Sequence, residues 1–159
     1  MSPEKLHELL KQVQDRSISV DEAVERLRHL PFEDLGFARV DHHRQIRCGF
    51  PEVIFCPSKT PEQVAAILTR LARTGSNVLA TRASREGFEY VRQQVKPEGL
   101  RYEEAARIIV LEQKACEKSE GFVAIVTAGT ADLPVAREAQ VTAEMLGCRT
   151  KLICDVGVA

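Results

Sequence analysis

Residues 121–159 read GFVAIVTAGTADLPVAREAQVTAEMLGCRTKLICDVGVA, and this stretch decides the fold class of the chain. Its unbroken apolar run at 123–126 predicts a parallel strand that is covered on both faces. The mostly apolar segment 136–146 predicts a helix that packs on a sheet and ends at Gly147. Residues 151–154 predict a second strand, so the whole stretch predicts a βαβ unit.

Such a unit needs support from elsewhere, because two strands and one helix leave faces and edges of the sheet uncovered. Segments below about 40 residues rarely fold alone without disulfides, metal ions or partners. We therefore expect the chain to be the N-terminal portion of a longer enzyme. We also expect the βαβ unit to dock on the preceding domain or on another copy of the chain.

The turn between the first strand and the helix, residues 127–132, consists of small and polar residues. In open α/β sheets, ligands bind beyond the carboxyl ends of the strands, where free N–H groups and the helix dipole favour an anion. Residues 127–132 and 155–157 should lie side by side there, with Thr130 or Asp132 capping the helix. The candidate substrate contacts are Thr127, Gly129, Thr130, Asp132, Asp155 and Gly157. An ordinary βα turn, in which Gly and Asp are common for geometric reasons, fits the pattern equally well.

The preceding part of the chain predicts two further regions. Residues 1–31 predict a helical hairpin, with a stripe of leucines in the first helix and a capping box at 19–22 opening the second. Residues 32–118 predict a small α+β domain with strands at 37–40, 53–56, 77–81 and 105–111. Its helices are expected after the capping box at 60–63 and over 84–95. Residues 119–159 then form the incomplete α/β domain.

The composition, with 44% hydrophobic and 28% charged residues, is typical of a globular protein. A net charge of −1 gives no reason to expect nucleic acid or a membrane surface as partner. No apolar run approaches the roughly 20 residues that span a bilayer. The five cysteines include no CxxC pair, so we interpret them as reduced thiols and predict no metal site.

Charged side chains are concentrated between the first two predicted strands of the α+β domain. Residues 39–52 hold three arginines, two histidines, an aspartate and a glutamate. Arg44 and Arg47 can clamp a carboxylate or phosphate from one side, whereas the adjacent His42 and His43 point opposite ways in extended chain and do not suit one metal ion. The possible anion contacts are Arg39, Asp41, His42, Arg44 and Arg47. A solvated loop with structural ion pairs is the alternative.

Arg82 and Arg85 flank a strand-to-helix turn and form a second candidate anion contact. The alternative for this pair is ordinary surface charge.

Three motifs together resemble one enzyme family: DLGFARVDHHR at 34–44, GFPEVI at 49–54 and TAGTADLPVA at 127–136. The family is the LarB-type carboxylases that make the nickel-pincer nucleotide of lactate racemase, and the resemblance spans nearly the whole chain. It implies a cytoplasmic enzyme that carboxylates the pyridinium ring of nicotinic acid adenine dinucleotide and hydrolyses its phosphoanhydride. The implied products are pyridinium-3,5-dicarboxylic acid mononucleotide and AMP.

The resemblance also implies a fold for the C-terminal domain, an oligomeric state, a co-substrate and a cation. The βαβ unit would begin a three-layer α/β domain like that of aminoimidazole ribonucleotide carboxylase, assembled into homo-octamers. Carbon dioxide or bicarbonate would be the co-substrate, and a divalent cation such as magnesium would assist.

The chemistry requires a thiolate that adds to the electron-poor ring and makes it nucleophilic toward carbon dioxide. In the family this cysteine lies beyond the position that matches Ala159, so the catalytic residue stays unassigned. Residues 1–159 alone are accordingly expected to be inactive.

Two other functions stay open from the sequence. One is a non-catalytic nucleotide-binding or assembly module. The other is an aminoimidazole ribonucleotide carboxylase of purine synthesis, whose Gly-Ser-x-Ser-Asp turn is matched poorly here, because Gly129 and Ala131 stand where its serines would be.

Overall fold

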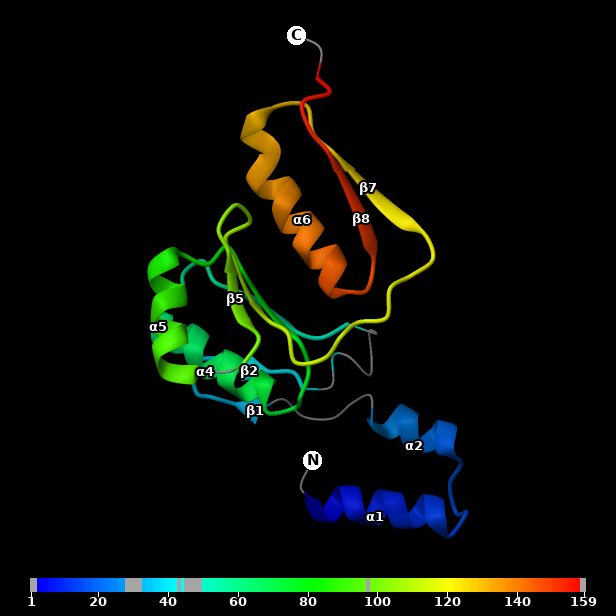
Figure 1. The fold of residues 1–159 in the computed structure, drawn as a ribbon. Helices are drawn as coiled ribbons and strands as arrows, with labels where there is room; N and C mark the ends of the chain where they lie inside the picture. Colours follow the sequence, from blue (N-terminus) through cyan, green and yellow to red (C-terminus); the bar gives the residue numbers. More distant parts are fainter. Residues whose placement is uncertain (1–2, 28–32, 43, 45–49, 97, 158–159) are drawn as a thin grey trace. The chain divides into compact units, whose positions relative to one another are not determined.

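The computed structural model describes residues 3–27, 33–42, 44, 50–96 and 98–157 (Figure 1). The chain divides into two compact units, Met1–Phe50 and Pro51–Ala159, and each is described by itself.

The first unit opens with two helices, α1 (Pro3–Gln14) and α2 (Val20–Leu27), which pack against each other. The predicted helical pair is therefore confirmed over these residues. The Ser19 hydroxyl accepts the Glu22 N–H at 3.0 Å, as expected for the start of α2. Residues 28–31, where the second helix was expected to end, lie outside the described residues.

A short antiparallel pair follows, made of β1 (Glu33–Asp34) and β2 (Arg39–Val40). Of the strand predicted over 37–40, only residues 39–40 form a strand, which is β2. The reason is a turn: the Asp34 carboxylate accepts the Gly36 N–H at 2.7 Å, and Gly36 takes the left-handed conformation at φ +81°. Phe37 lies in this turn and is half-exposed.

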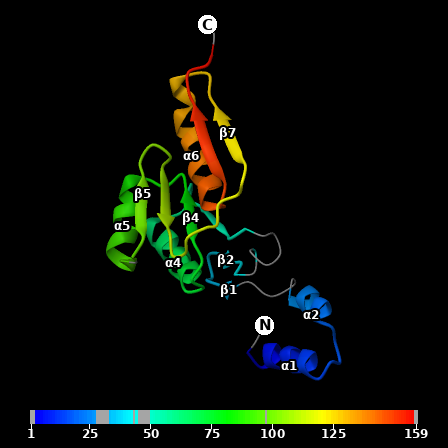
Figure 2. The same cartoon turned by 45° about the vertical axis from the view of Figure 1, so that its right-hand side comes forward.

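The second unit is built around a four-stranded sheet in the order β3-β4-β6-β5. The strands are β3 (Val53–Phe55), β4 (Val78–Thr81), β5 (Leu100–Glu103) and β6 (Ile108–Leu111), and only β3 and β4 are parallel. Helix α4 (Pro61–Ala72) connects the parallel strands, and α5 (Arg85–Val95) follows β4. The two helices pack together on one side of the sheet, and every residue of β4 and β6 is buried (Figures 1 and 2).

Both helices begin as the sequence predicts. Thr60 and Gln63 form the reciprocal capping box of α4, and the Ser84 hydroxyl accepts the Gly87 N–H at the start of α5.

The strand predicted over 105–111 needs correction, because residues 104–107 form a turn and the strand begins only at Ile108. Arg107 in this turn has a left-handed φ of +54°. The preceding segment forms β5, which was not predicted and pairs antiparallel with β6. Tyr102 of β5 stacks on Phe88 of α5 at 5.1 Å between ring centroids, which ties the hairpin to the helix layer.

The C-terminal βαβ unit is present as predicted. It contains β7 (Phe122–Val126), a 3₁₀ turn η1 (Thr130–Asp132), α6 (Leu133–Met145) and β8 (Arg149–Ile153), with the two strands parallel. Val141 and Met145 of α6 are buried in one cluster with Leu79, Ile108 and Val110 of the sheet. Helix α6 therefore covers the sheet face opposite α4 and α5, and the preceding domain supports the βαβ unit.

The expectation that the strand at 123–126 is covered on both faces is wrong for this chain. Phe122, Val123 and Val126 of β7 are 68%, 44% and 57% exposed. Within the described part of the second unit, neither β7 nor β8 pairs with a third strand, and α6 is the element that packs on them.

The polar and charged segment 114–120, which the sequence suggests is the link to the βαβ unit, is held together with Gln113 at several points. The Asn77 side-chain oxygen accepts the N–H groups of Gln113 and Lys114 at 2.8 and 2.9 Å, and its amide nitrogen donates to the Lys114 carbonyl at 2.8 Å. Further along, the Ser119 N–H donates to the Gly147 carbonyl at 2.8 Å. The segment thereby fixes where the βαβ unit begins.

We predict that Asn77→Ala lowers the free energy of unfolding by about 0.5–1.5 kcal/mol for each hydrogen bond lost, because two exposed backbone N–H groups exchange their acceptor for water. Asn77→Asp is the matched control, since a carboxylate still accepts from Gln113 and Lys114 and should lose less. Urea unfolding followed by circular dichroism measures both variants. Equal losses in Ala and Asp would contradict this role of the side-chain oxygen.

Candidate functional site

The carboxyl ends of β7 and β8 lie side by side, as expected. The Thr127 N–H donates to the Ile153 carbonyl at 3.0 Å, and the Val156 N–H returns a bond to the Thr127 carbonyl at 3.1 Å. The Gly157 N–H donates to the Ala128 carbonyl at 3.1 Å. A Cβ atom on Gly157 would stand 2.7 Å from that oxygen, so this contact requires glycine.

Asp132 closes the loop on itself rather than capping the long helix. Its carboxylate accepts the Gly129 N–H at 3.3 Å, and its own N–H donates to the Gly129 carbonyl at 3.2 Å. No side-chain cap bond is present at the start of α6, so the expected cap by Thr130 or Asp132 is wrong. The 3₁₀ turn η1 runs directly into the helix and takes the place of a cap.

The loop still presents donors. Among the described residues, the backbone N–H groups of Thr130 and Ala131 have no hydrogen-bond acceptor, and the Thr130 and Asp132 side chains are exposed. Free amides at the start of a helix are the groups that bind phosphate or carboxylate oxygens. The Gly129 N–H is not one of them, because Asp132 already occupies it.

Thr127 carries the least expected feature of the loop. It is only 6% exposed, and its hydroxyl oxygen is buried without a hydrogen-bond partner in the described structure. A buried unsatisfied hydroxyl costs about 1–3 kcal/mol. The turn therefore holds a polar group that a ligand oxygen or donor can satisfy.

Asp155, the remaining candidate of this set, is exposed and has a left-handed φ of +59° directly after β8. Aspartate tolerates this conformation better than most residues. Thr127, Gly129 and Thr130 on one strand end and Asp155 and Gly157 on the other thus share one edge of the sheet.

The second candidate set belongs to the first unit. The His42 Nε2 atom lies 2.7 Å from the Glu33 Oε2 atom, while the Nδ1 atom is buried without a partner in the described structure. Asp41 beside it is buried, and the Arg44 N–H reaches the Asp41 carbonyl at 3.5 Å. Arg39 is exposed and pairs with Asp34 at 3.7 Å. Arg47, and with it the expected Arg44–Arg47 clamp, lies outside the described residues, as does His43.

Arg82 and Arg85, the third candidate pair, differ from each other. Arg85 forms ion pairs with Glu89 and Glu104 on the surface. For Arg85, the structure therefore agrees with the alternative of ordinary surface charge. Arg82 lies over the Phe55 ring at 5.5 Å and contacts Glu138 of α6 at 3.6 Å.

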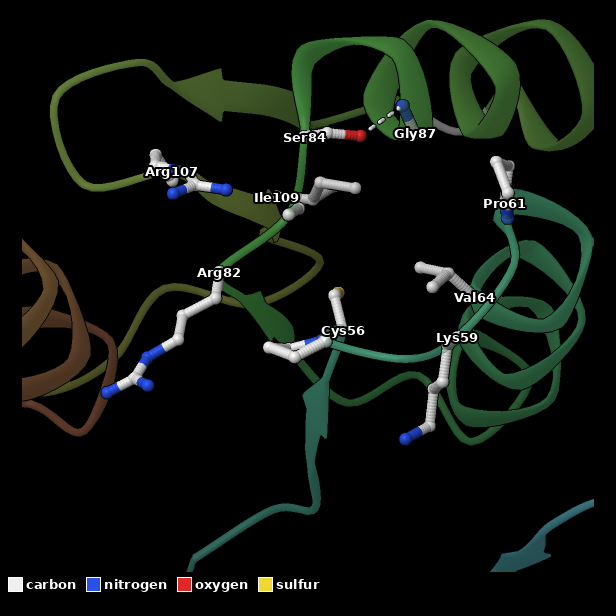
Figure 3. A pocket seen from close by; sticks show the side chains of 11 residues that line it. Cys56, Lys59, Pro61, Val64, Arg82, Ser84, Gly87, Arg107 and Ile109 are labelled. Atoms are coloured by element: carbon white, nitrogen blue, oxygen red, sulfur yellow. Dashed lines mark hydrogen bonds between the residues drawn. The ribbon is translucent and has the colours of Figure 1, made fainter.

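A cavity lies at the carboxyl ends of β3 and β4 (Figure 3). Of its lining residues the sequence singled out only Arg82, as a candidate anion contact. Cys56 lies in its wall, and burial raises the pKa of the Cys56 thiol to about 11, partly offset by the nearby Lys59. The predicted helix starts at 60 and 84 indicated where β3 and β4 end. No sequence pattern indicated the left-handed turn that places Arg107 beside the cavity.

Of the residues that the structure describes, no group of three His, Cys, Asp or Glu side chains is placed to hold a metal ion. No helix within those residues is long and apolar enough to cross a membrane.

Comparison with known proteins gives two matches. The family model described as the LarB/PurE-like N-terminal domain matches residues 32–114. An uncharacterized protein of Methanocaldococcus jannaschii is 30% identical over 161 residues, which cover 97% of this chain and 62% of the relative. The chain therefore spans about three-fifths of the length of the curated relative that it matches.

We predict that Thr127→Val raises the free energy of unfolding of the ligand-free protein by about 1 kcal/mol, because it replaces an unsatisfied hydroxyl by a methyl group of the same shape. Thr150→Val is the control: the Thr150 hydroxyl bonds Gln140 and Glu144, so its loss should destabilise. Thermal and urea unfolding measure both variants. A destabilised Thr127→Val would show that the hydroxyl already has a partner.

We predict that Cys56 resists alkylation at pH 8 and becomes reactive only as the pH approaches about 11, because the thiolate is the nucleophile and the raised pKa keeps the thiol protonated below that value. Exposed Cys154 is the internal control and should react at pH 8. Peptide mass mapping after iodoacetamide treatment distinguishes the two. Equal rates at pH 8 would contradict the assignment.

Proposed function

Since the chain belongs to the LarB/PurE-like family of carboxylase-type proteins, we propose that it forms part of an enzyme that carboxylates the pyridinium ring of nicotinic acid adenine dinucleotide. The same enzyme hydrolyses the phosphoanhydride, which gives pyridinium-3,5-dicarboxylic acid mononucleotide and AMP. This is the first step of nickel-pincer cofactor synthesis for lactate racemase, and we place it in the cytoplasm.

The observation that carries the proposal is the buried Thr127 hydroxyl without a partner in the described structure, at a turn with free Thr130 and Ala131 amides. A phosphate oxygen of the dinucleotide would be the hydrogen-bond acceptor for these donors. Gly129 and Ala131 provide no side-chain donor, so recognition rests on backbone groups and the threonine hydroxyls. Asp132 holds the turn in shape through the Gly129 N–H.

The residues of the first unit are proposed as a separate set of substrate contacts. His42 is held by Glu33 through Nε2 and keeps a buried Nδ1 atom that can bond a substrate group. Arg39 and Arg44 are proposed to contact the anionic parts of the substrate, with Arg47 as a further anion contact. Asp41, whose carboxylate can only accept hydrogen bonds when ionised, is proposed to act beside them on a donor group. Fixing one ring nitrogen orients the other, which is how an imidazole is prepared for proton transfer.

Carbon–carbon bond formation needs a thiolate that adds to the ring, and a base that removes the ring proton before the thiolate leaves. Cys56 is unsuited to this role, because burial keeps its thiol protonated at neutral pH. We propose that the nucleophile lies outside residues 1–159, that carbon dioxide or bicarbonate is the carboxyl source, and that a divalent cation such as magnesium assists.

We propose that the enzyme acts as a homo-oligomer, an octamer when complete. The exposed apolar residues of β7, together with Val135 of α6 at 66% exposure, support an assembly surface here. Exposed apolar side chains on a strand without a further neighbour are available to pack against another element or another copy.

The test combines turnover and binding. The complete protein that contains residues 1–159 is incubated with the dinucleotide, bicarbonate and magnesium, and AMP release and product mass are followed. Binding of the dinucleotide to the chain itself is measured by calorimetry. We expect AMP and the dicarboxylated product, and about 10–100-fold weaker binding in Thr127→Val, because a hydrogen bond to a charged group is worth about 1.5–3 kcal/mol.

Thr150→Val is the control for binding, since its hydroxyl lies in an internal network with Gln140 and Glu144. Absence of both products from the complete protein overturns the enzymatic proposal. Binding of the dinucleotide without AMP release would favour the non-catalytic module instead.

A further inference from the structure

A cavity of about 210 Å³ lies where the parallel strands β3 and β4 end and helices α4 and α5 begin. The Cys56 sulfur, Val64 and Ile109 point into it (Figure 3). Lys59, Arg82 and Arg107 line its margin, with the Lys59 and Arg82 side chains extending outward from it. None of these residues belongs to the loop at 127–132. In open α/β sheets this position, at the carboxyl ends of parallel strands, is where ligands bind.

The charged residues that line the cavity are all cations. Lys59, Arg82 and Arg107 come from three separate connections, and no Asp or Glu side chain lines the cavity. Arg82 is partly neutralised by Glu138 at 3.6 Å. In the part of the chain that the structure describes, no carboxylate forms an ion pair with Lys59 or Arg107, and the Lys59 ammonium donates to the Phe55 carbonyl at 2.8 Å. The rim therefore carries about two uncompensated positive charges.

Two of the cations are held by uncommon backbone. Arg82 and Arg107 have left-handed φ values of +53° and +54°, a conformation in which long side chains are rare. The Ala83 N–H donates to the Arg107 carbonyl at 2.8 Å and ties the two turns together. Backbone strain of this kind is concentrated at ligand sites, where it positions side chains in advance.

The helix ends alone do not make this site. The Gln63 N–H at the start of α4 is occupied by the Thr60 hydroxyl at 3.3 Å, and the Gly87 N–H at the start of α5 by the Ser84 hydroxyl at 3.0 Å. These bonds occupy one N–H group at each helix start, and both helices also contribute the field of their dipoles. The cationic side chains at the margin add the net charge that a charged ligand requires.

We propose that this cavity binds the phosphate group of a small phosphate monoester. Two uncompensated cations match the charge of such a group, about −1.5 to −2 at pH 7. A volume of about 210 Å³ is below the roughly 300–1,000 Å³ of pockets that enclose whole drug-sized ligands, so it accepts a phosphoryl head and a short carbon segment and not a dinucleotide. The apolar wall of Val64, Ala83 and Ile109 receives the carbon segment.

The test is a titration of the ¹⁵N-labelled chain with ribose 5-phosphate, followed by two-dimensional NMR. We expect saturable shifts of the amides of Lys59, Ser84 and Arg107, smaller shifts with inorganic phosphate and none with ribose. Arg107→Asn should raise the dissociation constant at least tenfold, because asparagine tolerates the left-handed turn and removes only the cation. Lys59→Gln should weaken binding several-fold and serves as a second variant.

Arg16→Asn is the matched control. Arg16 is also exposed and left-handed, at φ +57°, but it lies in the first unit and lines no part of the cavity, so binding should not change. Thr127→Val should bind ribose 5-phosphate like the unmodified chain, which separates this site from the dinucleotide loop. Equal affinity of Arg107→Asn and the unmodified chain, or equally tight binding of succinate, would overturn the proposal.

Discussion

Burial of Val141 and Met145 of α6 against Leu79, Ile108 and Val110 of the sheet is the contact on which the second unit depends. Full burial of one Val or Met side chain stabilises by about 1.5–3 kcal/mol, so the two together outweigh any single polar contact between α6 and the rest of the unit. The Arg82–Glu138 pair, half-exposed on the arginine side, contributes about 1 kcal/mol at most. Without the apolar contact, β7, α6 and β8 would be a unit of about 40 residues, a size that rarely folds alone.

The docked helix gives the unit two βαβ elements with different chemistry at equivalent places. In the first, β3-α4-β4, the helix start is fully capped by Thr60 and Gln63, and cations on neighbouring turns dominate. In the second, β7-α6-β8, the helix has no side-chain cap, and backbone amides with a buried hydroxyl dominate. A site of cations binds by charge and tolerates variety in the ligand, whereas a site of fixed amides selects by geometry. One fold rule thus gives two different candidate anion sites.

Sequence patterns correctly predicted the elements that local residues determine. They failed for the features that depend on contacts between distant parts of the chain. Capping boxes at 19–22 and 60–63 located two helix starts, and the apolar run at 123–126 located β7. Strand β5 was missed because its alternation is only four residues long and ends in a turn whose left-handed Arg107 has no sequence signature. The burial of β7 was overestimated. An apolar run indicates that a strand can be covered on both faces, but it does not indicate which elements cover it. Asp132 was expected to cap α6, but a carboxylate bonds whichever N–H is nearest, and that is Gly129.

Buried polar atoms without a hydrogen-bond partner support the proposed ligand contacts independently of the sequence motifs. In the described residues, two buried side-chain nitrogen or oxygen atoms have no hydrogen-bond partner: His42 Nδ1 and Thr127 Oγ1. Each costs about 1–3 kcal/mol, a large part of the 5–15 kcal/mol by which an ordinary domain is stable. Packing requires neither of them, since an apolar side chain of the same shape would fill either place. Both belong to residue sets that sequence pattern alone singled out for ligand contact, one in each unit. A ligand that forms a hydrogen bond with either atom removes that atom's cost, so the affinity of the ligand is increased by the energy that the unbound protein loses there.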